Sequence, residues 1–212
     1  MQVKRNVPRK SNEAKAAFGF KAHSGWAALI VLGTHGGELV VLERSRVELV
    51  EAEWAKQPYH AAEEANSAEA RKVVKRGIDA AKRIALREMR SALRRTRDCG
   101  FEVRACGLLV GSPMPDWSVA EILAVHFRMH KAEGVLFRDV LAKAAERCDL
   151  RVVAVPEKGL LERGEAVLKT RASSLSQQIA ALGKTVGAPW GKDQKEATLA
   201  AMIALQTSMT GQ

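Results

Sequence analysis

The sequence contains few cysteines, little aromatic character and no long apolar segment. Its three cysteines, Cys99, Cys106 and Cys148, show none of the CxxC spacing of metal or redox motifs. An odd and sparse set of thiols fits a reducing compartment better than a disulfide framework. The longest apolar run is Trp26–Leu32, which is far shorter than the roughly 20 residues of a transmembrane helix. Since the N-terminus also lacks the apolar core of a secretory signal, we expect a cytoplasmic protein without a membrane partner.

Acidic residues are also in short supply relative to basic ones. The chain has 34 Lys and Arg against 24 Asp and Glu, which gives a formal net charge of +10 and an isoelectric point of about 9.8. Such a charge favours an anionic partner, and nucleic acid, either DNA or RNA, is the partner that we expect. The glycine-rich signatures GxxxxGK[ST] and GxGxxG are absent, which argues against a nucleotide-driven machine.

The first third of the chain has the pattern of an antiparallel sheet. Three apolar, β-branched segments follow one another at short intervals: Phe18–Ala22, Trp26–Leu32 and Leu39–Leu42, the last continued by Val47–Val50. The first break contains Ser24-Gly25 and the second contains Gly36-Gly37, and glycine supplies the positive φ angles that tight reversals need. The pattern therefore predicts a three-stranded meander.

The remainder of the chain alternates helices with two further strands. The predicted strands are Phe101–Val110 and Leu150–Val155, and the predicted helices are Ser67–Arg97, Trp117–Lys131, Val135–Cys148, Leu160–Leu182 and Asp193–Leu205. A right-handed crossover joins the two later strands in parallel. We therefore expect an α/β fold with a mixed five-stranded sheet, three antiparallel strands and then two parallel ones, and helices on both faces. Residues 1–16 are predicted to be a basic flexible arm and residues 17–212 a single domain.

The helix Ser67–Arg97, which Ser67 can cap, carries a stripe of basic residues. At 100° per residue the apolar residues lie on one side: Val74, Ile78, Ala81, Ala85, Met89 and Ala92. Basic residues lie on the opposite side: Lys72, Arg76, Arg83, Arg87, Arg90, Arg94 and Arg97. This basic stripe is roughly 37 Å long at 1.5 Å per residue. Like charges at i,i+4 are unfavourable, so the stripe is either a solvated face or a surface for phosphate groups.

Three short strings add a resemblance to a known family. They are Phe20–Ala27 at the end of the first strand, Lys131–Gly134 in a later helix, and Asp193–Ala197 followed by Leu199–Ala201 in the last helix. With the order of the elements, they resemble the ribonuclease H-like fold and, within it, the RuvC group of Holliday-junction resolvases. The resemblance covers about residues 18–206, mostly as topology. It implies phosphodiester cleavage by two Mg²⁺ or Mn²⁺ ions, which carboxylates of strand one, strand four and the last helix hold in that family.

The sequence departs from this family at the positions of the metal ligands. Ala22, His23 and Ser24 stand near the expected acid of strand one, and strand four ends in Val110-Gly111-Ser112. Asp193 and Glu196 remain in the last helix, although Asp-x-x-Glu before an apolar run is also a capping box. One or two carboxylates from a single helix turn cannot hold two Mg²⁺ ions, so the standard mechanism is not expected.

Histidines supply the remaining candidates for chemistry. His126, His130 and Glu133 share one face of a helix at i, i+4 and i+7. This spacing is compatible with zinc, with a carboxylate or His23 completing a site, but isolated histidines more often pack or face solvent, and we assign no metal ligand. The candidate catalytic residues are His23, His130, Glu133, Asp193 and Glu196.

Three functions remain open from the sequence. The first is a nucleic-acid-binding ribonuclease H-like protein without the standard two-metal nuclease activity, and this is the hypothesis we favour. The second is an atypical metal-dependent phosphodiester hydrolase that uses histidine and carboxylate residues, with Mg²⁺ or Mn²⁺ as its metal. The third is a scaffold whose basic helix binds an acidic protein. A homodimer is compatible with each of them, and whether the protein is an enzyme stays undecided.

Overall fold

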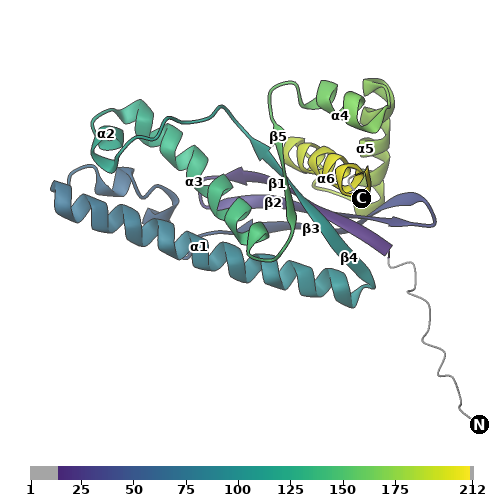
Figure 1. The fold of residues 1–212 in the computed structure, drawn as a ribbon, viewed down its shortest axis with the longest axis horizontal. Helices are drawn as coiled ribbons and strands as arrows, with labels where there is room; N and C mark the ends of the chain where they lie inside the picture. Colours follow the sequence, from purple (N-terminus) through teal and green to yellow (C-terminus); the bar gives the residue numbers. More distant parts are fainter. Residues whose placement is uncertain (1–13, 211–212) are drawn as a thin grey trace, which may run out of the picture.

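A computed structural model describes residues 14–210 and shows a mixed five-stranded sheet between two layers of helices (Figure 1). The strands are β1 (Ala14–His23), β2 (Trp26–His35), β3 (Glu38–Glu48), β4 (Phe101–Val110) and β5 (Arg151–Pro156). Their order in the sheet is β3-β2-β1-β4-β5. The first three strands are antiparallel, and β4 and β5 run parallel to β1 and to β4 respectively. The predicted fold class is confirmed.

Turn chemistry and alternation set the register of the meander. Gly25 has a φ of 82°, which closes the reversal between β1 and β2 and places His23 opposite Trp26. The strands are longer than the apolar segments predicted, and β3 runs without a break from Glu38 to Glu48, two residues short of the predicted end at Val50. Residues in its middle, such as Glu43, alternate with half-buried apolar residues on the edge of the sheet. Polar residues can therefore continue this strand, because side chains at the edge of the sheet stay in contact with water.

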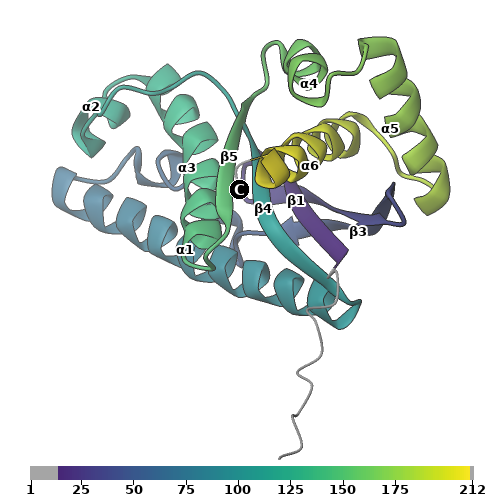
Figure 2. The ribbon, with the colours of Figure 1, turned by 45° about the vertical axis from the view of Figure 1, so that its right-hand side comes forward.

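Helices cover both faces of the sheet. They are α1 (Ser67–Asp98), α2 (Val119–Leu123), α3 (His126–Glu146), α4 (Leu160–Leu168), α5 (Ala172–Val186) and α6 (Lys192–Thr210), with two short 3-10 helices, η1 (Glu53–Lys56) and η2 (His60–Ala62). Figure 2 shows α1, α2 and α3 on one side of the sheet and α4, α5 and α6 on the other. Each layer encloses its own apolar core. None of the helices in this part of the chain has the length and apolar composition of a membrane span.

Helix α6 lies unusually close to the sheet because two strands present glycine to it. A Cβ atom on Gly19 of β1 would collide with the carbonyl group of Ala197, and one on Gly107 of β4 would collide with that of Ala200. The facing side of α6 is correspondingly lined with alanines that are fully buried. Backbone-to-backbone packing of this kind fixes α6 over β1 and β4.

Several predicted helix boundaries differ from the observed ones. Asn66, and not Ser67, caps α1, since its Oδ1 accepts hydrogen bonds from two backbone N–H groups of the first turn. The predicted helix Trp117–Lys131 is two helices in the structure. Ser118 forms a capping box at the start of α2, which ends at Leu123, and a new helix, α3, starts at His126. Asp116 lies two residues before this cap and does not form it.

Helices α3 and α4 each contain a glycine that does not end the helix. Helix α3 continues through Gly134, whose carbonyl group accepts a hydrogen bond of 2.6 Å from Arg138 Nε. The predicted helix Leu160–Leu182 divides into α4 and α5 at Lys169, where φ is 52°, and not at Gly164. Gly164 packs against Leu199 of α6. Of the predicted N-terminal arm, residues 14–16 belong to β1, and the rest lies outside the described residues.

Candidate functional site

The end of β1 that lies under the first turns of α6 carries a buried ammonium group. Alternation along the strand points Gly19 and Lys21 toward α6, and Lys21 is only 8% exposed. Its Nζ donates a hydrogen bond of 2.7 Å to Glu157 Oε2 and lies 3.0 Å from Glu196 Oε2. Glu157 follows directly after β5, and Glu196 belongs to the first turns of α6. One cation from β1 therefore joins two carboxylates from two other elements.

A second ion pair extends this cluster toward solvent. His23 Nε2 lies 3.0 Å from Asp193 Oδ2, one turn before Glu196 on α6. The ring of His23 stacks on Trp26, with ring centroids 4.3 Å apart and an interplanar angle of 14°. The guanidinium group of Arg46 lies 3.8 Å from the centre of the Trp26 ring. We call Lys21, His23, Glu157, Asp193 and Glu196 the β1 corner.

Two opposing effects act on the charge of Lys21. Burial by itself would lower the pKa of its ammonium group, but the hydrogen bonds and charges of Glu157 and Glu196 outweigh burial and raise the pKa above its ordinary value. Lys21 is therefore protonated at neutral pH. Its positive charge neutralises part of the negative charge of Glu157 and Glu196. Lys21 thus has the charge-balancing role toward these carboxylates that a bound divalent cation would have.

The structure brings together three of the five predicted catalytic residues. His23, Asp193 and Glu196 meet in the β1 corner. Capping does not explain the two carboxylates, because the backbone N–H of Gly191 donates instead to Gln194 Oε1 at 2.9 Å. Asp193 and Glu196 lie on the α6 face that continues, one turn later, with the alanines against the sheet, so helical spacing directs them to β1.

The other two predicted catalytic residues lie in the opposite layer. His130 and Glu133 belong to α3, and Glu133 accepts hydrogen bonds from the backbone N–H and the ring of His60 in η2. The five residues therefore do not form one site. The hypothesis that His23 completes a metal site with His126 and His130 is wrong as well, because α3 and α6 cover different faces of the sheet (Figure 2).

Sequence reasoning missed two members of the β1 corner. Lys21 had a visible signal, since it is the one charged residue within the apolar segment Phe18–Ala22. Glu157 had a weaker signal, since it extends the alternation of Val153 and Val155, which face the α6 layer. Only the parallel pairing of β4 with β5 places Glu157 next to β1.

The three carboxylates of the β1 corner, those of Glu157, Asp193 and Glu196, do not lie close enough together to share one ion. Within residues 14–210, one group of at least three His, Cys, Asp or Glu side chains is close enough to share an ion, and it lies elsewhere, in η2 and α3. On the side of β4 that faces α6, the residues on either side of Gly107 are Ala105 and Leu109, and neither is an acid. The observed geometry is ion pairing of Glu157 and Glu196 with Lys21.

The predicted basic stripe lies on the outer face of α1, and all seven of its residues are exposed. The buried side of α1 contains five of the six predicted apolar residues, and Ile78 is half-buried. Gly77 is buried because the ring of Pro58 and the side chain of Trp54 pack against it. The segment with η1 and η2 thus covers one flank of α1 and leaves the basic stripe accessible.

The basic stripe divides into a paired half and an unpaired half. Arg83 and Arg87 share Glu51, at 3.6 and 3.2 Å. Lys72 lies 3.4 Å from Glu69, and Arg76 lies over the ring of Trp54 at 4.6 Å. The hydrogen bond to Glu88, followed by that to Glu51, raises the pKa of Arg87.

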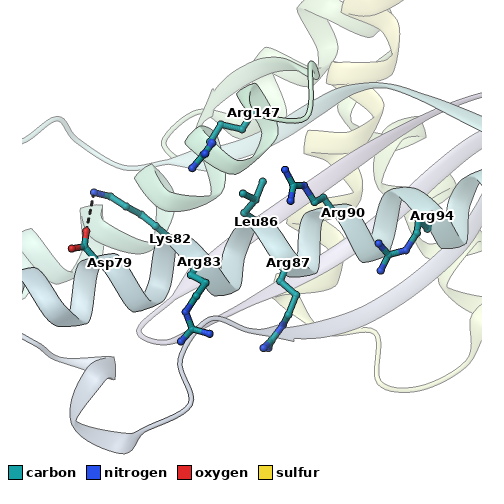
Figure 3. A pocket seen from close by; sticks show the side chains of 8 residues that line it. All are labelled: Asp79, Lys82, Arg83, Leu86, Arg87, Arg90, Arg94 and Arg147. Atoms are coloured by element: carbon teal, nitrogen blue, oxygen red, sulfur yellow. Dashed lines mark ion pairs between the residues drawn. The ribbon is translucent and has the colours of Figure 1, made fainter.

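The second half of the stripe contains guanidinium groups without acidic partners. Among the described residues, no ion pair involves Arg90, Arg94, Arg97 or Arg147. Arg147 follows the end of α3 and, with Arg90 and Arg94, lines an open hollow of about 540 Å³ between the two helices. Figure 3 shows Arg90 and Arg147 on one side of α1, with Arg94 extending along the other. We call this the α1–α3 basic surface.

The acid at the far end of this hollow is itself neutralised. Asp79 lies 3.6 Å from Lys82, and the hydrogen bond from Lys75 holds the pKa of Asp79 below its ordinary value. The hollow therefore presents an excess of positive charge at neutral pH.

The sheet order, the crossover between parallel strands and the closing helix α6 define a ribonuclease H-like fold. Two solved structures of RuvC from Thermus thermophilus share this fold, one of them in complex with a Holliday junction substrate. Each is 11% identical in sequence, with TM-scores of 0.51 and 0.50, and the alignments cover 93% and 92% of this chain and 96% of each RuvC chain. No protein-family model and no curated protein sequence matches the chain. The predicted RuvC-like fold is thus confirmed.

Proposed function

We propose that this protein binds nucleic acid through the α1–α3 basic surface and does not hydrolyse phosphodiesters by the two-metal mechanism. The observation that supports the proposal most directly is the group of guanidinium groups without acidic partners at Arg90, Arg94, Arg97 and Arg147. Arg83 and Arg87, on the same helix, have an acid within reach. Unpaired guanidinium groups on successive turns of α1 and at the end of α3 are suited to an external polyanion.

The basic stripe suits phosphate groups in its length and its chemistry. It is roughly 37 Å long at 1.5 Å per residue, and over that length one strand of a duplex carries about eleven phosphates at a rise of 3.4 Å per nucleotide along the axis. Each phosphate that a guanidinium neutralises releases counterions, so binding becomes strongly dependent on salt. One of the two similar structures is described in complex with a Holliday junction, which makes branched DNA the first ligand to test.

The β1 corner supports the second part of the proposal. Its ammonium group lies within 3.0 Å of both Glu157 and Glu196. A Mg²⁺ ion at this position would have to displace a buried, hydrogen-bonded cation and would meet its repulsion. Hard divalent ions need several oxygen ligands in close, regular geometry, which the two carboxylates and the more distant Asp193 do not supply.

The test measures binding and cleavage in the same samples. Fluorescence anisotropy with labelled single-stranded DNA, duplex DNA, four-way junction and RNA is recorded across a salt series, with and without Mg²⁺ or Mn²⁺. The triple variant Arg90→Gln, Arg94→Gln, Arg147→Gln should weaken binding and reduce the slope of log K against log salt by about 3. A gel of the bound samples should show no metal-dependent cleavage.

The matched control removes the same number of charges elsewhere. The variant Arg163→Gln, Arg171→Gln, Lys184→Gln changes exposed residues of the α4–α5 layer and should leave the salt slope nearly unchanged. Equal effects of both triple variants would show that net charge, and not this surface, governs binding. Failure of the unmodified protein to bind any of the four ligands at low salt would overturn the proposal and favour an acidic protein partner.

A further inference from the structure

Three histidine rings from two elements meet beside the N-terminal end of α3. His60 belongs to η2, and His126 and His130 lie one turn apart on α3. His126 Nε2 and His130 Nε2 are 3.1 Å apart. One ligand nitrogen from each of the three rings lies within 4.8 Å of the others. Residues that are far apart in the sequence thus present a triangle of imidazole nitrogens.

A buried carboxylate holds one of these rings in a defined orientation. Glu133 is 1% exposed, and its Oε2 lies 2.8 Å from His60 Nδ1, while its Oε1 accepts the backbone N–H of His60 at 3.2 Å. With the proton on Nδ1 donated to Glu133, the lone pair of His60 is on Nε2. That Nε2 atom is buried and has no hydrogen-bond partner among the described residues. A buried nitrogen acceptor without a partner is costly, and a bound cation would satisfy it.

The spacing of the nitrogens agrees with that of zinc ligands. Tetrahedral zinc with Zn–N distances of 2.0–2.1 Å requires ligand nitrogens about 3.3 Å apart. The distance between His126 and His130 is 3.1 Å, and small rotations of exposed rings close the third side of the triangle. Zinc-binding histidines typically donate their other N–H to a carboxylate, which is the role Glu133 has toward His60. Glu63 Oε1 lies 3.9 Å from the second nitrogen of His126.

We propose that His60, His126 and His130 bind a zinc ion, with Glu133 as the positioning residue for His60. Three imidazoles leave the fourth position of a tetrahedral ion for water or an external ligand. The ion would fasten η2 to the start of α3, where the chain has just left α2. The proposal uses none of the residues of the α1–α3 basic surface, so it stands or fails independently of nucleic-acid binding.

Metal titration of the tag-free, chelator-treated chain tests the proposal. Calorimetry should show one equivalent of Zn²⁺ bound per chain, and Co²⁺ should give the visible spectrum of a four-coordinate ion. At free zinc 100-fold above the Kd, the melting temperature should rise by about 5–10 °C. His126→Ala should abolish specific binding without affecting folding, because the side chain of His126 is 64% exposed. His35→Ala, at the exposed end of β2, should bind zinc normally.

The positioning role of Glu133 has a separate readout. Glu133→Gln retains an oxygen acceptor for the backbone N–H of His60 but loses the charge that orients the ring. It should weaken zinc affinity about 10- to 100-fold while the Co²⁺ spectrum of the loaded variant stays four-coordinate. The proposal is overturned if the unmodified chain binds no zinc, or if His126→Ala binds one equivalent as tightly as the unmodified chain.

Discussion

The β1 corner and the outer face of α1 use the same kinds of charged side chain in opposite ways. In the β1 corner, a lysine that is 8% exposed lies within 3.0 Å of two carboxylates. On α1, Arg90, Arg94 and Arg97 are exposed and have no acidic partner among the described residues. Burial requires a charge to be paired, because an isolated charge away from water is very costly. Exposure allows a charge to stay unpaired and available to a ligand.

This difference separates structural charges from candidate binding charges. Charges that are already satisfied within the protein contribute to the position of α6 and β5, and a ligand would have to break those contacts. Unpaired exposed charges add little to stability, since surface ion pairs are worth about 0–1 kcal/mol even when they form. We therefore expect substitutions in the β1 corner to affect folding, and substitutions on the α1–α3 basic surface to affect binding alone.

The largest effect is expected where α6 contacts the sheet. Gly19→Ala places a methyl group against the backbone of Ala197, and neither the strand nor the helix can move without breaking neighbouring contacts. We expect a loss of about 3 kcal/mol or more in the free energy of unfolding, measured by urea denaturation. The same substitution at Gly36, which has open space around its Cβ position but a φ of 60°, should cost about 1 kcal/mol.

Removal of the buried cation should have the next largest effect. Lys21→Met leaves Glu157 and Glu196 facing each other without a counter-charge, and we expect destabilisation of about 2–3 kcal/mol, below the range for fully buried pairs because Glu157 can reach water. Arg94→Met on α1 is the matched change, and it should alter stability by less than about 0.5 kcal/mol. Similar urea midpoints for the two variants would contradict the distinction between the two regions.

The ion pair between Glu43 of β3 and Arg95 of α1 should make an intermediate contribution to the free energy of unfolding. Burial raises the pKa of Glu43, but hydrogen bonds from Arg95 and Ser45 outweigh it and hold that pKa below its ordinary value. The pair therefore stabilises the fold above the unfolded-state pKa of about 4.3, and its contribution is lost as the pH falls through the folded-state pKa. Glu43→Gln should cost about 1 kcal/mol at pH 7. The two proteins should converge in acid, and a difference that persists after protonation would point to packing instead.

The smallest effect on stability, and the most direct test of the comparison, is expected at Glu51. Glu51→Gln releases Arg83 and Arg87 from their shared acid. Both guanidinium groups then become available to a ligand, next to those of the unpaired half of the basic stripe. Nucleic-acid affinity should rise a few-fold, and the salt slope should increase by about 1 to 2. The free energy of unfolding should hardly change. Unchanged affinity in the anisotropy assay would place the binding surface away from this part of α1.

Local patterns predicted the sheet, and they failed mainly where helices meet loops. The β-branched segments and the turn at Gly25 gave the meander, and the helical periodicity of α1 gave both of its faces. The low helix propensity of glycine does not fix the helix ends, because Gly134 and Gly164 lie inside helices. Tertiary packing decides such cases. The side chain of Leu199 packs against Gly164, where a larger residue would not fit, and such packing offsets the cost of about 1 kcal/mol that glycine has in a helix.

The amino-acid sequence by itself determined the strand order of the meander, the basic face of α1 and the absence of acids from the ends of strands one and four. These features depend on alternation, helical spacing and residue type, all of which are local. The tertiary structure alone decided which charges are paired. Lys21 meets Glu157 only because β5 pairs with β4, and His60 meets His126 and His130 only because η2 packs against α3. Such contacts join residues far apart in the chain, and no local pattern encodes the distance between them.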